Sequence, residues 1–514
     1  MSVLKNFNRS LTGAVLLISL STFNYGFDNQ GFATAQAMDS FTRQFGDKNH
    51  KTGKYELNNV WLSLFSSLIY IGFSAGIILG SSLNAWVGRR RTMFILSTYE
   101  IITATIIVTS QTREQILAGR VLNCKSTFND VYIGMELAVV PVFQSEIVPT
   151  PVRGLAVSTY QFSLIFGGLV MNCICLGTSS ISDNRAWRIP LGLFYIIPSI
   201  IMASIFTIPE SPRWLLIKGR EEEALQSLTR LRKGAFSQQE IEREFEAIRL
   251  GLIAEPEQGS FTELFQGVNR KRTFIAAGVH FLQNLCGQDI VSKFGSLIVK
   301  SLHTISPFVM TVVFAITNLV FVFTGMLTND KIGRRPLLML SAAQQMTALL
   351  ILGGIGHTGW PLAKRYQPVS IVMLVLQTAG FSIGFAPLTN VVTTEIVALR
   401  LRDRTQLLAC TMNVIANFAV GFSLPYLLNA PYANLHLQIG WVFAPICFIA
   451  LVFVYFMVPE CKGKSMEQID RMFHEGISIR QFGKYNIADV TEESYVTELA
   501  AKSGDVTHVE ERER

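Results

Sequence analysis

Arginine and glutamate residues recur in the same order in the two halves of this 514-residue chain, at the ends of apolar segments. Guanidinium and carboxylate groups form ion pairs, which are individually modest where water reaches them. A set of such pairs could hold two parts of a protein together in one state and release them in another. We therefore predict gating ion pairs. The residues are Arg89, Arg90, Glu146, Arg153 and Glu210 in the first half, and Arg334, Arg335, Glu395, Arg402 and Glu460 in the second.

These acids are not arranged for catalysis. The sequence holds no nucleophile–base pair, metal-binding cluster or phosphate-binding loop beside them. The seven cysteines show no C-x-x-C or Cys/His spacing, so no metal or other cofactor is expected. We predict a protein that is not an enzyme.

Long apolar segments must position these charges. The chain is 49% hydrophobic and 16% charged, with a mean hydropathy of +0.35, whereas soluble domains carry about 25% charged residues. Segments of about 20 apolar residues cross a hydrocarbon core of about 30 Å, so we predict an all-α membrane protein with twelve transmembrane helices. The predicted spans are Leu11–Ala33, Val60–Ser82, Thr92–Ser110, Gln115–Gln144, Leu155–Gly177, Trp187–Ile208, Thr273–Val299, Pro307–Thr328, Leu337–Ile355, Val369–Val392, Gln406–Leu428 and Gly440–Met457.

The formal net charge of +7 is spread over short basic clusters between apolar segments, such as Arg89–Arg91 and Arg400–Arg404. This distribution is typical of cytosolic loops and differs from the single basic face of a nucleic-acid-binding domain. No nucleic-acid partner is expected. Because the number of spans is even, both termini lie on one side, which the Lys/Arg excess predicts to be cytosolic.

The chain divides into two bundles and two polar segments. We predict six-helix bundles at 1–208 and 273–458, a cytosolic helical linker at 209–272, and a partly disordered cytosolic tail at 459–514, frayed beyond about Phe473. The ordered repeat of the arginine and glutamate motifs predicts that the bundles are pseudo-repeats. Two such halves, with a solute site between them near the bilayer midplane, are the architecture of major facilitator transporters.

The motifs resemble the sugar porter family of that superfamily along nearly the whole chain, with fungal members most similar. The similar segments are "GFDNQG" (Gly26–Gly31), "VGRRR", "SEIVPTPVRG" (Ser145–Gly154), "PESPRWL" (Pro209–Leu215), "DKIGRRP" and "PECKGKSMEQID" (Pro459–Asp470). The resemblance implies secondary transport of a sugar or sugar-like polar solute by alternating access. The expected setting is the plasma membrane, and the expected state is a monomer in the bilayer.

Amide side chains suit such a solute, because they donate and accept hydrogen bonds without a net charge. Polar residues inside apolar helices are also functional candidates in general. The family pattern assigns solute contacts to one set of amides, to which we add the nearby Gln288. That set is Gln161, Gln283, Asn284, Asn318 and Asn413.

Three positions depart from the family pattern. Asp289 replaces an amide, and Lys293 follows it by four residues, so the two could pair on one helical face. Asn390 stands at the family's tryptophan or polar position on helix ten, and Val414 replaces a tryptophan. The solute could therefore be a polyol, a disaccharide, a hydroxy-acid or a specialised metabolite rather than a hexose.

Asp28 in the first helix is the candidate for proton coupling. A carboxyl group beside Arg120 of the fourth helix could alternate between an ion pair and a protonated form, and the resemblance implies proton symport. The alternative is a structural acid near the external rim. Lys125–Asp130 reads as a polar insertion in the fourth helix, which would interrupt that helix.

A second class of function stays open. A nutrient sensor on the same scaffold would signal without transport and would need a long cytosolic tail for its partners. The tail after Pro459 is short, so we favour a transporter whose partners are a small polar solute, H⁺ and the bilayer.

Overall fold

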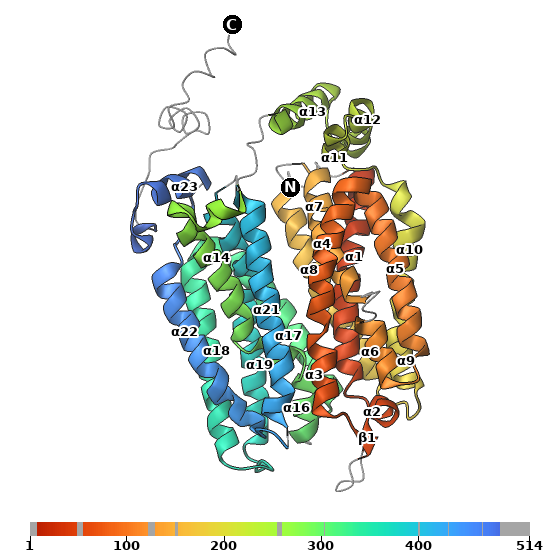
Figure 1. The fold of residues 1–514 in the computed structure, drawn as a ribbon, viewed down its shortest axis with the longest axis vertical. Coiled ribbons are helices and arrows are strands. Elements are labelled where there is room, and N and C mark those ends of the chain that lie inside the picture. The colour runs from red at the N-terminus through yellow and green to blue at the C-terminus, as the bar shows by residue number, and fades with distance from the viewer. Residues whose placement is uncertain are drawn as a thin grey trace.

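The computed structural model describes residues 8–48, 55–121, 129–149, 153–253, 260–302, 304–398, 401–429, 431–464 and 466–483. These residues fold into two side-by-side helical bundles, beneath a layer of shorter helices at one end (Figure 1). The strands β1 (Asp47–Lys48) and β2 (Tyr55–Glu56) pair antiparallel at the opposite end. Nine segments of the described chain are long and apolar enough to cross a membrane. The segments α3–α4, α6–α7 and α14–α16 complete the twelve predicted spans.

The N-terminal half consists of six spans, several of which are divided. In this half α1 packs along α8, and α4 packs along α7. The fourth span is described as α6 and α7, and most of the insertion predicted between them lies outside the described residues. The elements are α1 (Arg9–Ala35), α2 (Asp39–Phe45), α3 (Asn59–Ser67), α4 (Ile69–Val87), α5 (Arg89–Thr109), α6 (Arg113–Val121), α7 (Asn129–Ile147), α8 (Arg153–Thr178), α9 (Arg185–Gly192), η3 (Leu193–Tyr195), α10 (Ile196–Ser204) and η4 (Ile205–Thr207).

The C-terminal half repeats this plan, with α14 packed along α21 and α18 along α22. Its tenth span is divided at Gly384, between α19 and α20. The elements are α14 (Gly267–Leu285), α15 (Gln288–Ser292), α16 (Gly295–Leu302), α17 (Pro307–Ile332), α18 (Arg334–His357), α19 (Gln367–Ile383), α20 (Phe385–Ile396), α21 (Arg402–Leu428), η7 (His436–Ile439) and α22 (Gly440–Met457).

The predicted seventh span, Thr273–Val299, is wrong as a single helix. It is divided at Gly287, whose φ of +85° is a conformation that side chains other than glycine rarely adopt. A Cβ atom at Gly287 would lie 3.2 Å from Ile290 Cδ1 and 3.4 Å from Phe443. The glycine therefore serves the turn between α14 and α15.

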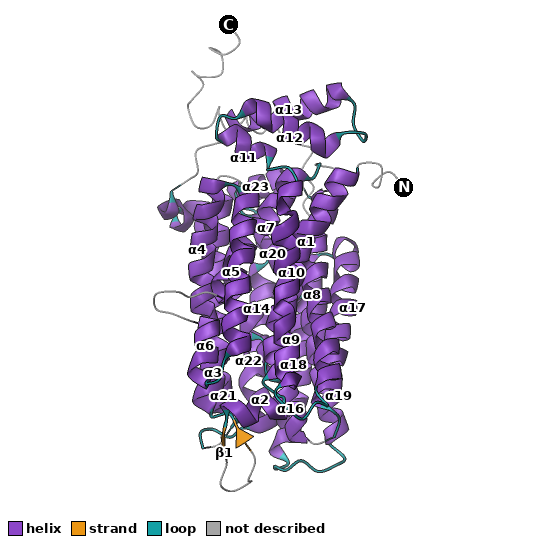
Figure 2. Cartoon of the chain, turned by 90° about the vertical axis from the view of Figure 1, so that its right-hand side faces the viewer, coloured by secondary structure: helices purple, strands orange, loops and turns teal. Residues whose placement is uncertain are grey.

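The linker forms three helices over the end of the N-terminal half (Figure 2): α11 (Pro212–Ile217), α12 (Glu221–Arg232) and α13 (Gln238–Ile253). A short turn, η5 (Phe261–Phe265), precedes α14. Arg232 is 1% exposed; it donates to both Glu244 oxygens at 2.7 and 2.8 Å and to the Ile147 carbonyl at 2.8 Å. A single buried guanidinium thus ties two linker helices to the end of α7.

The chain after the last span packs against the C-terminal half. Arg272 forms an ion pair with Asp470 of α23 (Met466–His474), and η8 (Ile479–Gln481) follows. Phe482 is fully buried, so the predicted fraying beyond Phe473 is wrong for residues 474–483.

The two halves contact each other at the end away from the linker, mainly through α3 against α21 and α8 against α17. Ser63 Oγ donates to the Phe422 carbonyl at 2.9 Å, and Asn429 donates to Asn59 Oδ1 at 3.0 Å. Lys300 Nζ of α16 lies 2.6 Å from Asp39 Oδ1 of α2. Hydrogen bonds and an ion pair therefore join the halves at this end.

Candidate functional site

In the N-terminal half, the predicted ion-pair residues meet at the first turn of α5. Arg89 donates to both oxygens of Glu146, at 2.6 and 2.8 Å, and both side chains are 9% exposed. The Glu210 carboxylate accepts the backbone N–H groups of Arg89 and Arg90 at 3.1 and 3.2 Å. Gly88, with φ +93°, permits this approach, because a Cβ there would lie 2.8 Å from Glu210 Oε2. An anion thus caps the helix terminus, where the helix dipole favours negative charge.

The C-terminal half repeats this arrangement at the first turn of α18. Arg334 donates to Glu395 at 2.8 Å, although these side chains are somewhat more exposed, at 11% and 18%. Glu460 accepts the backbone N–H groups of Arg334 and Arg335 at 3.1 and 3.0 Å. Gly333 has a φ of +105°, and a Cβ there would lie 2.6 Å from Glu460 Oε2. The sequence repeat is therefore a repeat of geometry as well.

Each of these pairs joins segments of one half, where the sequence suggested contacts between halves. Arg402 donates to the Thr394 carbonyl at 3.1 Å, again within the C-terminal half. The side chain of Arg153 lies outside the described residues. Burial raises the pKa of Glu210, and its backbone donors from Ser211, Arg90 and Arg89 oppose that shift.

The predicted amides of α14 and α21 form one hydrogen-bonded cluster, and all are half-buried. Asn413 donates to Gln283 Oε1 at 3.3 Å, and Asn284 donates to the Asn413 carbonyl at 3.4 Å. Gln283 donates in turn to the Phe385 carbonyl of α20 at 3.2 Å. Three helices of the C-terminal half therefore contribute to a polar patch next to the break at Gly287.

Two further residues, Asn417 and Tyr70, extend this cluster into the N-terminal half. Asn417 donates to Asn413 Oδ1 at 3.0 Å, and the Tyr70 hydroxyl of α4 donates to Asn417 Oδ1 at 3.2 Å. Sequence reasoning missed both residues. The position of Asn417, one helical turn after Asn413, was an available signal, whereas nothing local indicated Tyr70.

Asp289 and Lys293 form the ion pair that their spacing predicts, at 2.5 Å on α15 and its C-cap. Their side chains are only 9% and 15% exposed. The ammonium group also lies 4.6 Å from the centre of the Tyr70 ring, so it gains a cation–π contact. The pair therefore lies where α15 meets the opposite half.

The other predicted solute contacts are dispersed. Asn318 Oδ1 of α17 accepts a hydrogen bond from Ser382 at 2.8 Å. Gln161 of α8 is half-buried and makes no hydrogen bond within the described part of the chain, and Gln288 Oε1 is buried with no partner there. Asn390 lies on the exposed side of α20. The structure brings together only the α14 and α21 amides.

Asp28 lies in the middle of α1 and is 5% exposed. The side chain of Arg120, its predicted partner, lies outside the described residues. A second acid, Glu136 of α7, is fully buried; Tyr160 of α8 donates to its Oε2 at 3.4 Å, and its Oε1 has no hydrogen-bond partner in the described segments. Within the described residues, the N-terminal half thus holds three buried carboxyl groups, those of Asp28, Glu136 and Glu100 of α5, of which Asp28 and Glu136 are our candidates to carry a proton.

A cavity of about 1250 Å³ opens between the halves at the end opposite the linker. Asp39 and Lys300 line it, as do Asn59, Asn429 and the stacked Trp360–His436 pair, whose ring centres are 4.3 Å apart. Polar groups from both halves therefore surround a space large enough for a small solute.

Known proteins resemble this chain in sequence and in fold. The hexose transporter HXT13 of Saccharomyces cerevisiae is 29% identical over 474 residues, which cover 90% of this chain and 82% of that protein. The inward-open xylose transporter XylE of E. coli superposes with a TM-score of 0.73 at 20% identity, covering 90% and 99% of the two chains. XylE bound to 6-bromo-6-deoxy-D-glucose, described as a proton:xylose symporter, gives a TM-score of 0.68 with the same identity and coverage.

A family described as "Sugar (and other) transporter" matches residues 14–473. This match covers both bundles, the linker and α23, and the two halves have the fold of a major facilitator protein. The chain is therefore a multi-pass membrane protein that belongs to the sugar transporter family of the major facilitator superfamily.

Proposed function

We propose that the protein moves a sugar, or a closely related polar solute, across the membrane together with a proton. The amide cluster of Gln283, Asn284 and Asn413 carries this proposal. Its members are half-buried, and they meet Tyr70 of the opposite half through Asn417. A hydroxyl-rich guest can exchange its hydration for hydrogen bonds to such groups. The similarity to HXT13, a hexose transporter, supports this solute class.

The contacts between the halves suggest how the solute gains access. They join α3 to α21 and α8 to α17 at the external end, where Lys300 pairs with Asp39. Rocking of the halves would break these contacts and bring the other ends together. In that second state Arg89 and Arg334 would exchange contacts within each half for contacts between halves. The two states need to differ by only a few kcal/mol for such exchange.

Proton coupling is the finer part of the proposal. Asp28 and Glu136 are both buried in the N-terminal half, whereas the amide cluster lies mainly in the C-terminal half. XylE, described as a proton:xylose symporter, has the same fold. We expect one of these carboxyl groups to bind the transported proton. We further propose a monomer in the plasma membrane.

A second solute class is favoured by one observation. The Asp289–Lys293 pair adjoins Tyr70, next to the amide cluster, and its ammonium group could turn towards an anionic guest. A hydroxy-acid would then replace Asp289 as the partner of Lys293. Polyols and uncharged metabolites use only the amides and would not need this lysine.

Uptake into liposomes tests these alternatives. Protein-loaded and empty liposomes would receive radiolabelled hexoses, pentoses, polyols and hydroxy-acids, with and without an inward proton gradient. Accumulation that needs the gradient and disappears with a protonophore supports symport. Equal uptake with and without the gradient would indicate facilitated diffusion rather than symport. No uptake of any polyhydroxy solute would favour the non-transporting sensor.

A further inference from the structure

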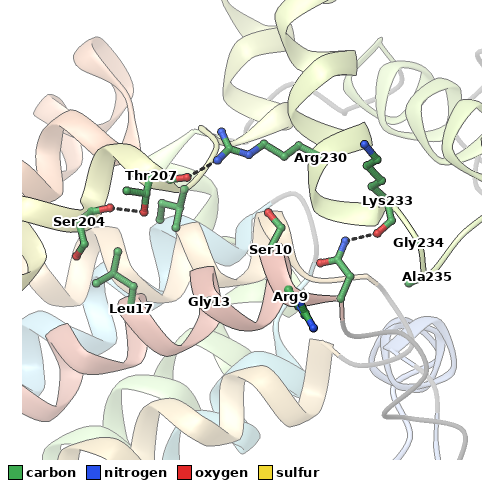
Figure 3. Close-up of a pocket in the computed structure, with 12 residues that line it drawn as sticks. Arg9, Ser10, Gly13, Leu17, Ser204, Thr207, Arg230, Lys233, Gly234 and Ala235 are labelled. Carbon is green, nitrogen blue, oxygen red and sulfur yellow. Dashed lines mark hydrogen bonds between the residues drawn. The ribbon is translucent and has the colours of Figure 1, made fainter.

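A second cavity lies at the cytosolic end of the N-terminal half, away from the solute pathway. It measures about 770 Å³ and is bounded by the start of α1, the end of α10 with η4, and the end of α12. Figure 3 shows Arg230 and Lys233 extending from the end of α12 above the first turn of α1, where Ser10 points towards them. Its volume falls in the range of about 300–1,000 Å³ that ligand pockets occupy.

The upper part of this cavity is cationic. Arg9, Arg230 and Lys233 line it, no acidic side chain does, and none of the three has an ion-pair partner in the described residues. Arg9 lies at the rim, and its guanidinium group points away from the other two cations in Figure 3. Arg230 and Lys233 therefore bring two positive charges to one side of this cavity, and no acidic side chain lines it.

One hydrogen bond holds the Arg230 side chain, and another holds the backbone at Lys233. Arg230 donates to the Thr207 carbonyl at 2.6 Å, and Arg90 donates to the adjacent Phe206 carbonyl at 2.7 Å. Asn8 caps α1 through Leu11 and also donates to the Lys233 carbonyl at 2.8 Å. Arg90 does not line the cavity and has the Glu210 carboxylate nearby, so Arg230 is the guanidinium group left to meet an anion there.

The lower part of the cavity is apolar and adjoins the surface that faces lipid. Leu17, Gly13 and Ile208 line it, and a Cβ atom at Gly13 would meet nothing within 4 Å. Next to these residues, Leu16 is 65% exposed and Phe206 is 50% exposed. Exposed apolar residues on membrane-spanning helices contact acyl chains. A ligand here would meet cations at the cytosolic surface and hydrocarbon below it.

We propose that this cavity binds the phosphate-bearing headgroup of an anionic phospholipid from the cytosolic leaflet. Basic pockets between transmembrane helices on the cytosolic side suit such headgroups. The hydroxyl group of Ser10 offers a further hydrogen bond to a phosphate oxygen, whereas that of Ser204 already donates to the Ile200 carbonyl. A bound lipid would join α1, η4 and α12, and would so fix the linker on the N-terminal half.

Binding to the delipidated, full-length protein tests this proposal by native mass spectrometry. The lipids are short-chain phosphatidylserine and phosphatidylinositol 4-phosphate, compared with phosphatidylcholine. Each cation near a membrane surface contributes about 1 kcal/mol to binding anionic lipid, so the R230Q/K233Q variant should bind the anionic lipids about 30-fold more weakly. The matched control R243Q/K271Q removes two exposed cations outside the cavity and should bind as the wild type does.

Gly13→Leu provides an independent steric test. It keeps every charge, fills the space beside α1 and favours the helix. We expect it to reduce anionic-lipid binding as well. Two results would contradict binding in the cavity and indicate diffuse attraction to the protein surface. One is unchanged binding by Gly13→Leu, and the other is a loss in R243Q/K271Q equal to that in R230Q/K233Q. If equal concentrations of inorganic phosphate or glycerol 3-phosphate displaced the lipid, the cavity would be a site for free phosphate compounds and the proposal of a lipid ligand would be wrong.

Discussion

The two halves of this protein carry the same ion-pair arrangement at one end, and they differ in the polar residues of their interiors. Arg89, Glu146 and Glu210 form the same contacts as Arg334, Glu395 and Glu460, down to the positive-φ glycine before each helix. The N-terminal interior, however, holds buried acids such as Glu136 beside tyrosines, whereas the C-terminal interior holds the cluster of amides and, next to it, the Asp289–Lys293 ion pair. The repeated ion-pair arrangement suits the rocking movement that we propose for both halves. The interiors suit the separate tasks that we propose, proton binding in the N-terminal half and solute binding in the C-terminal half.

The largest effect should come from breaking one of the ion pairs that the two halves have in common. Glu146→Gln leaves the guanidinium of Arg89 buried without its charge partner, which costs about 3–5 kcal/mol in buried pairs. Glu395→Gln should cost less, because its pair is more exposed. Thermal unfolding in detergent would measure both losses. The double variant Arg89→Gln/Glu146→Gln should recover part of the stability, and equal losses in the two halves would contradict the comparison.

The next effect tests the C-terminal interior. Gln283→Ala leaves the polar partners of Gln283, including Asn413, without a hydrogen bond, and removing a partner in this way costs about 1–3 kcal/mol. We expect about tenfold weaker solute binding, with the proton dependence of uptake unchanged. Gln239→Ala is the matched control, because this exposed amide lies on the linker helix α13. If Gln283→Ala also lost the proton dependence of uptake, solute binding and proton coupling would not be separate tasks of the two interiors.

The third effect tests the N-terminal interior. A proton gradient of one pH unit supplies about 1.4 kcal/mol, or tenfold accumulation. Asp28→Asn or Glu136→Gln should abolish this accumulation while solute exchange in the absence of a gradient continues. Uptake and exchange assays on the same liposomes separate the two activities. Persistence of gradient-driven accumulation in both variants would exclude Asp28 and Glu136 as the groups that bind the transported proton.

The smallest effect should come from the contact that links the two interiors. Tyr70→Phe removes one hydrogen bond to Asn417, worth about 1 kcal/mol. We expect a shift away from the externally closed state, so a cysteine-reactive probe on the external side should label a reporter cysteine at Leu297 more in this variant than in one with Tyr70 intact. Unchanged labelling would mean that Tyr70 does not help to close the external side.

Much of the fold followed from the sequence because it depends on local spacing. Apolar segment length predicted the spans, and the repeated motifs predicted two similar halves. The four-residue interval between Asp289 and Lys293 predicted their ion pair, because helix geometry fixes that distance. The repeated motifs around Gly88 and Gly333 correspond to one local geometry, a positive-φ glycine followed by a helix start that a carboxylate caps.

Only the tertiary structure decided which distant groups meet. It placed Arg89 and Arg334 on acids of their own halves, divided the seventh span at Gly287, and brought Tyr70 to Asn417. It also gathered Asn8 and Lys233, 225 residues apart, around one cavity. A pattern of residues fixes which side of a helix is polar, but the packing of whole helices fixes what that side faces, and packing depends on every neighbour at once.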